Sequence, residues 1–388
     1  RGGARSAAQG DRQVLERRHP LELADALGHF VRTQVEHALG PEGLDVEGGE
    51  RGAVDHRPHE QVVVHGVLGV RGDVARELTE PPRDARRAIA AHMAEDYSGT
   101  IAPDEVCVTS GCNQAFAAAM MAIAKAGDNV IVTVPYFFNH TMWLGMLGIE
   151  ARFIPAISGT VTHPRPEDAA ALIDERTRAI ILCSPNNPTG AVFPEQQLRS
   201  VAEMLTRHPR VMLLTDEIYE HLRYDDALHH SIAALEPRLR DRTLVVNGVS
   251  KAYAMTGLRV GYAGGPADLI QAMIKLQSQT TSCACSLSQA AAVAALNGSQ
   301  DIVGERRAVM AARRGRLIER LSGIRGLGFT APRGAMYFFC DCRELLGLRT
   351  PAGAIVQSDA DFVRYLLDEF KLVVIQGSAY GLPGYFRI

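Results

Sequence analysis

Residues 247–261 read Asn-Gly-Val-Ser-Lys-Ala-Tyr-Ala-Met-Thr-Gly-Leu-Arg-Val-Gly and begin at the end of the apolar run 243–247. This stretch places Lys251 among small and apolar residues just beyond a predicted strand, where a partly desolvated amine can form a Schiff base with an aldehyde. A solvated surface lysine is the weaker interpretation, because only four of the chain's 41 basic residues are lysines. Arg259 follows eight residues later, and its planar guanidinium suits a phosphate group.

A regular alternation of apolar runs and helical patterns surrounds this stretch from about residue 84 onward. The apolar runs are rich in Val and Ile and lie at 106–109, 129–134, 179–183, 211–215 and 243–247. The helical patterns lie at 113–125, 194–206, 269–278 and 302–321. Because these strands are apolar throughout, we predict an α/β fold with a mostly parallel sheet covered on both faces. A strand-like run at 335–341 and a helical pattern at 359–369 predict a smaller α+β layer.

Composition excludes several classes of protein. The chain of 388 residues suits one large α/β unit with a smaller satellite. No apolar run approaches the roughly 18 residues of a membrane span, and a net charge of -3 provides no general basic field for nucleic acid or anionic membranes. We therefore expect a small-molecule partner, no nucleic acid and no membrane.

Cysteine usage favours a reducing, cytoplasmic location. The seven cysteines include no C-x-x-C pair, and the N-terminus has no apolar signal region. The C-x-C pairs Cys283/Cys285 and Cys340/Cys342 lack the usual spacing of metal ligands. We predict both pairs as buried small side chains, and we expect no metal site.

Two predicted strand ends carry polar side chains that could face one ligand. Asn187 lies in the loop Ser-Pro-Asn-Asn-Pro-Thr-Gly after the run 179–183, although a simple turn is the alternative. Asp216 ends the next run and could hold a proton on a heterocyclic nitrogen, with a helix N-cap as the alternative. Tyr219, three residues on, can face the same ligand.

A possible phosphate loop precedes these segments. Thr-Ser-Gly-Cys-Asn-Gln, residues 109–114, lies between the strand 106–109 and a predicted helix. Backbone N–H groups and the helix dipole bind phosphate in this geometry. A plain helix cap by Ser110 or Asn113 explains this segment alone equally well.

Taken in chain order, the loop asparagine, the strand-end Asp-x-x-Tyr, the Ser-Lys pair and the later arginine resemble the class I, fold-type I aminotransferases. These enzymes use pyridoxal 5'-phosphate. The resemblance covers roughly residues 85–388 and looks closest to the prokaryotic aspartate aminotransferase branch, because of Asn-Gly at 247–248, Ala-Met-Thr-Gly-Leu-Arg at 254–259 and Gln-Gly-Ser-Ala-Tyr-Gly at 376–381. It implies a mostly parallel seven-stranded sheet in a large cofactor-binding domain at 84–295, a smaller α+β domain at 296–388, and a homodimer.

The resemblance also implies roles for the matching residues around the cofactor ring. Lys251 would form the Schiff base and then move the proton between substrate Cα and cofactor C4'. Asp216 would keep the pyridinium protonated, so that the ring accepts electrons. Asn187 and Tyr219 would hydrogen-bond the ring oxygen O3'.

Further matches would hold the phosphate and the substrate. Arg259 would bind the phosphate with three residues of the loop, Gly111, Cys112 and Asn113. Ser250 would compensate for a phosphate-binding serine that the family has at the position of Gly248. Phe137 takes the place of the ring that stacks on the cofactor, with a core aromatic as the alternative. Arg387 would pair with the substrate α-carboxylate.

Three departures from the family pattern qualify these expectations. Asn113 stands where the prokaryotic branch has a lysine that reads a distal carboxylate, so the resemblance does not carry aspartate specificity to this chain. Residues 1–83 lack lysine and the family's N-terminal pattern, and we interpret them as a frame-shifted or misassembled translation, or as a disordered segment. The chain ends at Ile388, where relatives continue, so the small domain is expected to be incomplete.

The predicted function is the transfer of an amino group between an L-amino acid and a 2-oxo acid. A β-lyase or decarboxylase of the same fold would use the same lysine and aspartate. A ligand-sensing, aminotransferase-like regulator without turnover is the other alternative. Residues 1–83 carry no convincing helix-turn-helix pattern to support it.

Overall fold

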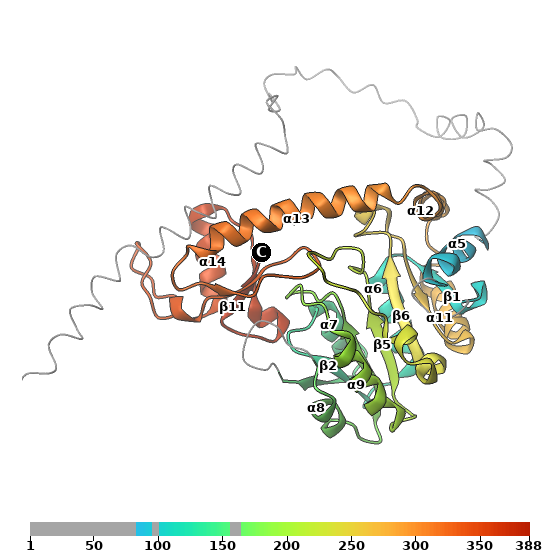
Figure 1. Cartoon of the computed structure of the whole chain (residues 1–388). Helices are drawn as coiled ribbons and strands as arrows, with labels where there is room; N and C mark the ends of the chain where they lie inside the picture. The colour runs from blue at the N-terminus through green and yellow to red at the C-terminus, as the bar shows by residue number, and fades with distance from the viewer. Residues whose placement is uncertain (1–82, 95–100, 156–163) are drawn as a thin grey trace, which may run out of the picture.

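The computed structural model describes residues 83–94, 101–155 and 164–388 (Figure 1). The expectation for residues 1–83 therefore lies, except for its last residue, outside the described part of the chain. The described residues form two β-sheets with helices packed around them.

A seven-stranded sheet forms the larger layer, in the strand order β1-β7-β6-β5-β4-β2-β3. Its strands are β1 (Val106–Thr109), β2 (Asn129–Thr133), β3 (Glu150–Ile154), β4 (Thr177–Cys183), β5 (Met212–Asp216), β6 (Thr243–Gly248) and β7 (Gly261–Gly264). β7 runs antiparallel to its neighbours β1 and β6, and the other four pairs are parallel. The predicted α/β fold with a mostly parallel seven-stranded sheet is thus confirmed.

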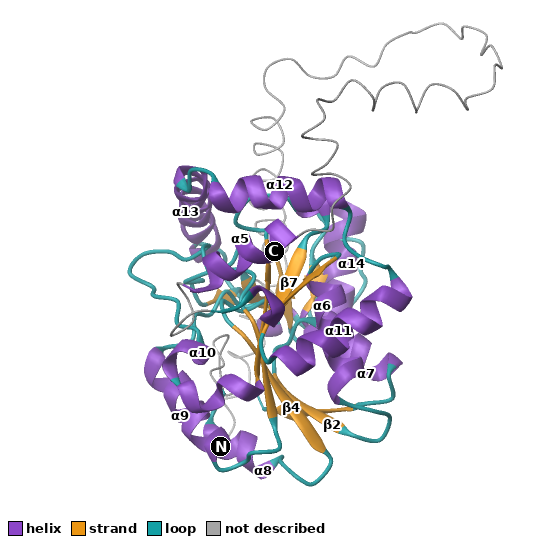
Figure 2. Cartoon of the chain, turned by 90° about the vertical axis from the view of Figure 1, so that its right-hand side faces the viewer, coloured by secondary structure: helices purple, strands orange, loops and turns teal. Residues whose placement is uncertain are grey.

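Helices cover both faces of this sheet, and Figure 2 shows α7 and α11 on one side of β2 and β4, with α8 and α9 on the other. Helices α6 (Cys112–Ile123), α7 (Phe138–Met146) and α11 (Ala267–Thr280) take one face, and α5 (Arg83–Ala94), α8 (Pro166–Ala171), α9 (Glu195–Thr206), α10 (Ile232–Leu235) and α12 (Ser286–Asn297) take the other. In β2, Val132 packs in the core with Met120 of α6, whereas its neighbour Ile131 packs with Leu198 of α9. A strand with both faces buried has no polar side, which explains the continuous apolar runs.

A four-stranded antiparallel sheet forms the smaller layer, in the order β10-β11-β9-β8. Its strands are β8 (Gly328–Phe329), β9 (Phe339–Asp341), β10 (Ile375–Gln376) and β11 (Tyr385–Arg387), and helix α14 (Asp359–Phe370) packs against it. Helix α13 (Asp301–Ser322) reaches from the end of α12 to this layer (Figure 1). Short 3₁₀ segments complete the described elements, at Pro103–Glu105 (η1), Pro237–Arg242 (η2), Thr256–Leu258 (η3), Arg343–Leu345 (η4) and Gly377–Tyr380 (η5).

The strand predicted at 335–341 is only partly correct. The observed strand β9 begins at Phe339, because Ala335 has a left-handed backbone with φ +56°. The N–H of Ala335 donates instead to the carbonyl oxygen of Leu222 in the larger layer. Tyr337 follows this left-handed residue, and its hydroxyl contacts that of Tyr219 in the larger layer.

The prediction for the cysteines is correct for one pair and wrong for the other. Cys340 and Cys342 are buried in the core of the smaller layer. Cys283 and Cys285 are exposed, because they lie in the turn that joins α11 to α12 rather than in a core-facing element.

Candidate active site

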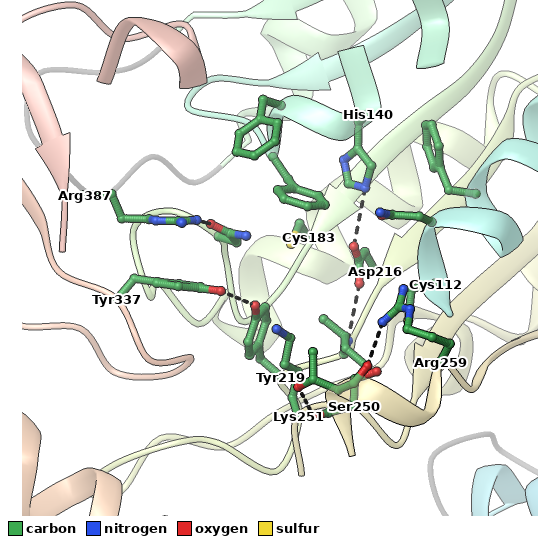
Figure 3. A pocket seen from close by; sticks show the side chains of 17 residues that line it. Cys112, His140, Cys183, Asp216, Tyr219, Ser250, Lys251, Arg259, Tyr337 and Arg387 are labelled. Carbon is green, nitrogen blue, oxygen red and sulfur yellow. Dashed lines mark hydrogen bonds and ion pairs between the residues drawn. The ribbon is translucent and has the colours of Figure 1, made fainter. Parts of the chain in front are cut away.

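A cavity of about 220 Å³ lies at the carboxyl ends of β4, β5 and β6, beside the smaller sheet (Figure 3). Residues predicted from the sequence come together in its lining, namely Cys112, Asn113, Phe137, Asn187, Asp216, Tyr219, Ser250, Lys251, Arg259 and Arg387. Gly111 immediately precedes Cys112 and lies against the Arg259 guanidinium. The convergence follows from topology, because parallel strands bring their carboxyl ends to one edge of a sheet.

Asp216 lies at the floor of the cavity and is 6% exposed. The Nε2 atom of His140 lies 3.4 Å from Asp216 Oδ2, and the backbone N–H of Ile218 donates to Oδ1 at 3.4 Å. Turns rather than a helix follow β5, so the helix N-cap alternative for Asp216 is wrong. A buried carboxylate held in this way can keep a proton on a basic ring nitrogen.

His140 is a site residue that the sequence analysis missed. It lies in the first turn of α7 and is 4% exposed. Its ring meets the Phe137 ring edge-on, with centroids 5.4 Å apart. The sequence does carry a signal for His140. It follows Phe137 by three residues, and this spacing places the two side chains on the same side of a helix that starts here.

Lys251 and Tyr219 face the cavity together. The Lys251 Nζ atom lies 5.6 Å from the centroid of the Tyr219 ring. The Tyr219 hydroxyl lies 2.5 Å from the hydroxyl of Tyr337, a second residue that the sequence analysis missed. Burial, with Tyr337 as the next cause, raises the pKa of Tyr219 well above its usual value. Tyr219 therefore stays a neutral phenol that can donate a hydrogen bond.

Arg387 enters the cavity from β11 of the smaller sheet. Its Nη1 donates to Asn187 Oδ1 at 2.7 Å, a contact between residues 200 positions apart. The guanidinium carbon lies 4.3 Å from the centroid of the Tyr337 ring and 5.1 Å from that of Tyr380. The two aromatic faces and the amide oxygen fix the orientation of the arginine.

Very close backbone packing defines the phosphate end of the cavity. Gly111 has φ +84°, and a Cβ added there would collide with the Arg259 guanidinium. A Cβ on Gly261 would collide with the backbone of Gly111 and Cys112. The first turn of α6, a 12-residue helix, begins at Cys112. Glycines thus let Arg259 and the N–H groups of a helix start approach one point, as binding of a phosphate requires.

Close backbone packing leaves no room for a side chain at Gly248. A Cβ there would lie 2.8 Å from the Val260 carbonyl oxygen, 2.9 Å from Gly261 Cα and 3.2 Å from Cys112 Sγ. The Cys112 thiol itself donates to the Asn247 carbonyl oxygen at 3.2 Å. Burial, followed by the nearby Asp216 charge, raises the pKa of the Cys112 thiol. The backbone of Val260 and Gly261, with the protonated Cys112 thiol beside it, therefore occupies the space that a serine side chain would need.

The chemistry of this donor set fits pyridoxal 5'-phosphate. An arginine and a helix N-terminus suit its phosphate, and a buried carboxylate suits its ring nitrogen. A neutral phenol and an amide suit its ring oxygen, and a lysine amine suits its aldehyde. Fold and site together define the class of protein as a fold-type I, pyridoxal-phosphate-dependent aminotransferase.

The comparisons with known proteins agree. The family model for aminotransferase class I and II matches residues 75–388, and the chain belongs to this family. It is 42% identical over 318 residues to the aspartate aminotransferase of Rhizobium meliloti (strain 1021), covering 82% of this chain and 78% of that protein. It is 35% identical over 373 residues to a probable aspartate/prephenate aminotransferase of Rhizobium leguminosarum bv. phaseoli, covering 94% and 93%.

A solved structure gives the same result. The crystal structure of the aspartate aminotransferase from Rhizobium meliloti matches with a TM-score of 0.77 and 36% identity, covering 96% of this chain and 91% of that one. The protein is thus a pyridoxal-phosphate-dependent transaminase that acts on amino acids and 2-oxo acids, and the lyase, decarboxylase and regulator alternatives are not favoured. Across the described ranges, no helix has the length and apolar character needed to span a bilayer.

Proposed function

We propose that transamination takes place in the cavity at the carboxyl ends of β4, β5 and β6, with Lys251 as the residue that moves protons. The observation that carries this proposal is the convergence of Lys251, Asp216 and Arg387 on one cavity from three distant parts of the chain. Bound pyridoxal 5'-phosphate supplies an aldehyde that takes up the amino group and a ring that withdraws electrons.

The residues around the ring have separate tasks in this proposal. Lys251 takes the proton from the substrate Cα and delivers it to cofactor C4'. Asp216, with His140 beside it, keeps the ring nitrogen protonated. Tyr219 donates to the ring oxygen O3', and its contact with Tyr337 orients it.

Arg259 and Arg387, which would bind the phosphate and the substrate carboxylate, lie at opposite ends of the cavity (Figure 3). Arg259, the N–H groups of Gly111 and Cys112, and the Ser250 hydroxyl would hold the phosphate. Phe137 would stack on one face of the ring. Because Asn187 Oδ1 accepts from Arg387, the amide nitrogen of Asn187 is left to donate to O3'. Arg387 binds the α-carboxylate of the substrate in bidentate fashion.

We further propose two domains, at 84–295 and 296–388, and a homodimer. Helices α12 and α13 leave large apolar side chains partly exposed, with Leu287 63%, Ile302 39% and Val309 51% exposed. A second subunit could bury such side chains, which supports the proposed homodimer. All seven cysteines are unpaired, in agreement with a reducing, cytoplasmic location.

Aspartate is the amino donor that we propose. The relatives described above are named for aspartate or for aspartate and prephenate. In this chain the donor side chain would approach Asn113, whose amide can donate to a distal carboxylate but brings no charge. Recognition of that carboxylate is therefore expected to be weaker than with a lysine at this position.

A panel of L-amino acids tests the proposed function. Each amino acid is mixed with the purified full chain carrying its cofactor, and the absorbance spectrum and the released 2-oxo acid are followed. We expect aspartate to convert the cofactor to its amine form, with one oxo acid released for each cofactor converted. Release of pyruvate and ammonia without an oxo-acid acceptor, or no conversion by any amino acid, would contradict the proposal.

Replacing Asn113 with lysine is expected to raise kcat/KM for aspartate about fivefold relative to an uncharged donor. The added ammonium would face the distal carboxylate at the partly exposed edge of the cavity, where an ion pair contributes about 1 kcal/mol. Steady-state kinetics with aspartate and alanine measure the ratio. An unchanged ratio would show that Asn113 does not face the donor side chain, and Asn113→Gln serves as the uncharged control.

A further inference from the structure

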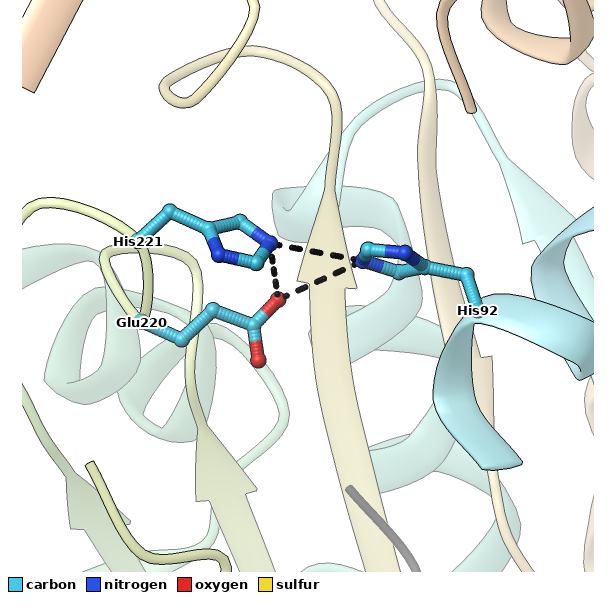
Figure 4. Close-up of side chains that lie close together, drawn as sticks. All are labelled: His92, Glu220 and His221. Atoms are coloured by element: carbon cyan, nitrogen blue, oxygen red, sulfur yellow. Dashed lines mark hydrogen bonds and ion pairs between the residues drawn. The ribbon is translucent and has the colours of Figure 1, made fainter. Parts of the chain in front are cut away.

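Outside the cavity, His92, Glu220 and His221 each bring one side-chain nitrogen or oxygen atom to a common point (Figure 4). The Nε2 atoms of His92 and His221 lie 3.4 Å apart. Glu220 Oε1 lies 3.3 Å from the His221 nitrogen and 3.7 Å from the His92 nitrogen. The three atoms therefore form a nearly equilateral triangle.

The dimensions of this triangle match one face of a tetrahedral metal site. Zinc bonds imidazole nitrogen and carboxylate oxygen at about 2.0–2.1 Å, which separates the ligand atoms of a regular tetrahedron by about 3.3–3.4 Å. Two of the three observed separations fall within this range, and the third exceeds it by a few tenths of an ångström. Two histidines with one glutamate are also a ligand set that zinc uses in proteins.

The triangle joins distant parts of the chain in a defined orientation. His92 comes from α5, whereas Glu220 and His221 lie in the turns after β5. Asn247, near the end of β6, donates its Nδ2 hydrogen to Glu220 Oε1 at 2.7 Å. A hydrogen bond of this kind fixes a ligating carboxylate in place, as the partners around metal ligands generally do.

Solvent can reach this point, where the three side chains offer two imidazole nitrogens and a carboxylate oxygen. The His221 and His92 side chains are 30% and 14% exposed, which leaves a path from solvent.

We propose that His92, Glu220 and His221 bind a divalent transition-metal ion such as Zn²⁺, with water in the fourth position. Two imidazoles disfavour Mg²⁺ and Ca²⁺, which prefer oxygen ligands. The sequence analysis expected no metal site because the cysteine pairs lack the spacing of metal ligands. The two histidines lie 129 positions apart, so no short motif joins them. The site is distinct from the transamination cavity, whose lining includes none of the three ligands.

Zinc titration of the untagged, cofactor-loaded full chain tests the proposal. The protein is first dialysed against a chelator, and calorimetry and elemental analysis then measure the affinity and the number of ions bound. His92→Gln and His221→Gln are each expected to remove one Zn²⁺ per chain, or to weaken that ion's binding about 100-fold. Loss of a residue that only hydrogen-bonds a metal ligand typically lowers metal affinity about 10–100-fold, and loss of a ligand itself should lower it at least as much.

His230→Gln is the matched control. His230 lies 4.0 Å from Glu195, in a histidine–carboxylate pair outside the triangle. The control should bind Zn²⁺ as the wild type does. Any Zn²⁺ bound by other histidines or by the cofactor is then the same in the wild type, the control and the ligand variants. Circular dichroism and the cofactor absorbance verify that each variant is folded.

Cobalt provides an independent readout. Co²⁺ bound to the wild type should show the intense visible bands of tetrahedral coordination, and these bands should be lost in His92→Gln. Equal Zn²⁺ binding by the wild type and both ligand variants, no specific Zn²⁺ binding by the wild type, or an octahedral Co²⁺ spectrum would overturn the proposal.

Discussion

Replacing Lys251 with alanine is expected to lower the transamination rate at least about 10⁴-fold. In the role proposed for it, the Lys251 amine moves the proton at the substrate Cα. The other nearby cations are guanidinium groups, Arg259 at the phosphate end and Arg387 at the substrate end, and a guanidinium does not give up its proton at neutral pH. Single-turnover conversion by aspartate, followed by absorbance and oxo-acid release, measures the loss.

Lys275→Ala is the matched control for this experiment. Lys275 is exposed on α11 and does not line the cavity, so its loss should leave the rate unchanged. Compared without cofactor, the Lys251 variant should keep the wild-type melting temperature, because truncating a partly buried side chain at a cavity wall removes little core packing. A rate within tenfold of the wild type would show that Lys251 is not the proton-moving residue.

Replacing Asp216 with asparagine is expected to lower the rate about 10³-fold, which corresponds to about 4 kcal/mol of transition-state stabilisation. The two side chains have the same shape, but an amide carries no charge to keep the ring nitrogen protonated. The contacts of Asp216 with His140 and with the Ile218 N–H allow the substituted side chain to remain in place. The kinetic experiment described for Lys251 measures the effect.

Asp128→Asn is the matched control for Asp216→Asn. It removes a buried carboxylate charge at a position away from the cavity. Asp128 is buried, pairs with Arg178 at 2.9 Å and lies outside the cavity. Its replacement should lower the melting temperature without changing the rate of the folded enzyme. If Asp216→Asn behaved in the same way, Asp216 would be a structural residue rather than the partner of the ring nitrogen.

The fold could be predicted from sequence where strands are buried on both faces. The run 179–183 corresponds to β4, which extends only two residues further, to Thr177. The edge strand β3 escaped prediction, because its partly exposed sequence Glu-Ala-Arg-Phe-Ile has no continuous apolar run. Strand β7 escaped prediction for a different reason. Its sequence Gly-Tyr-Ala-Gly has low β propensity, and Gly261 serves the close approach of the phosphate loop.

The site could be predicted where its residues follow strands. Asn187, Asp216 and Lys251 come shortly after, or at the ends of, neighbouring strands, and topology alone brings them together. Tyr337 could not be found in this way, because its position depends on the left-handed backbone at Ala335. The place of His92 beside Glu220 and His221 depends on how α5 packs against the turns after β5. Sequence spacing does not encode that tertiary contact.

The contact between Arg387 and Asn187 determines how the cavity attracts its substrate. Asn187 and two tyrosine rings hold Arg387 in place, and among the described residues no carboxylate forms an ion pair with it. A neutral partner orients the guanidinium without cancelling its charge. An incoming carboxylate therefore meets a preorganised electrostatic attraction and has no counter-ion to displace. Amines without a carboxylate lack this attraction, so discrimination begins at encounter, before the reacting carbon is in place.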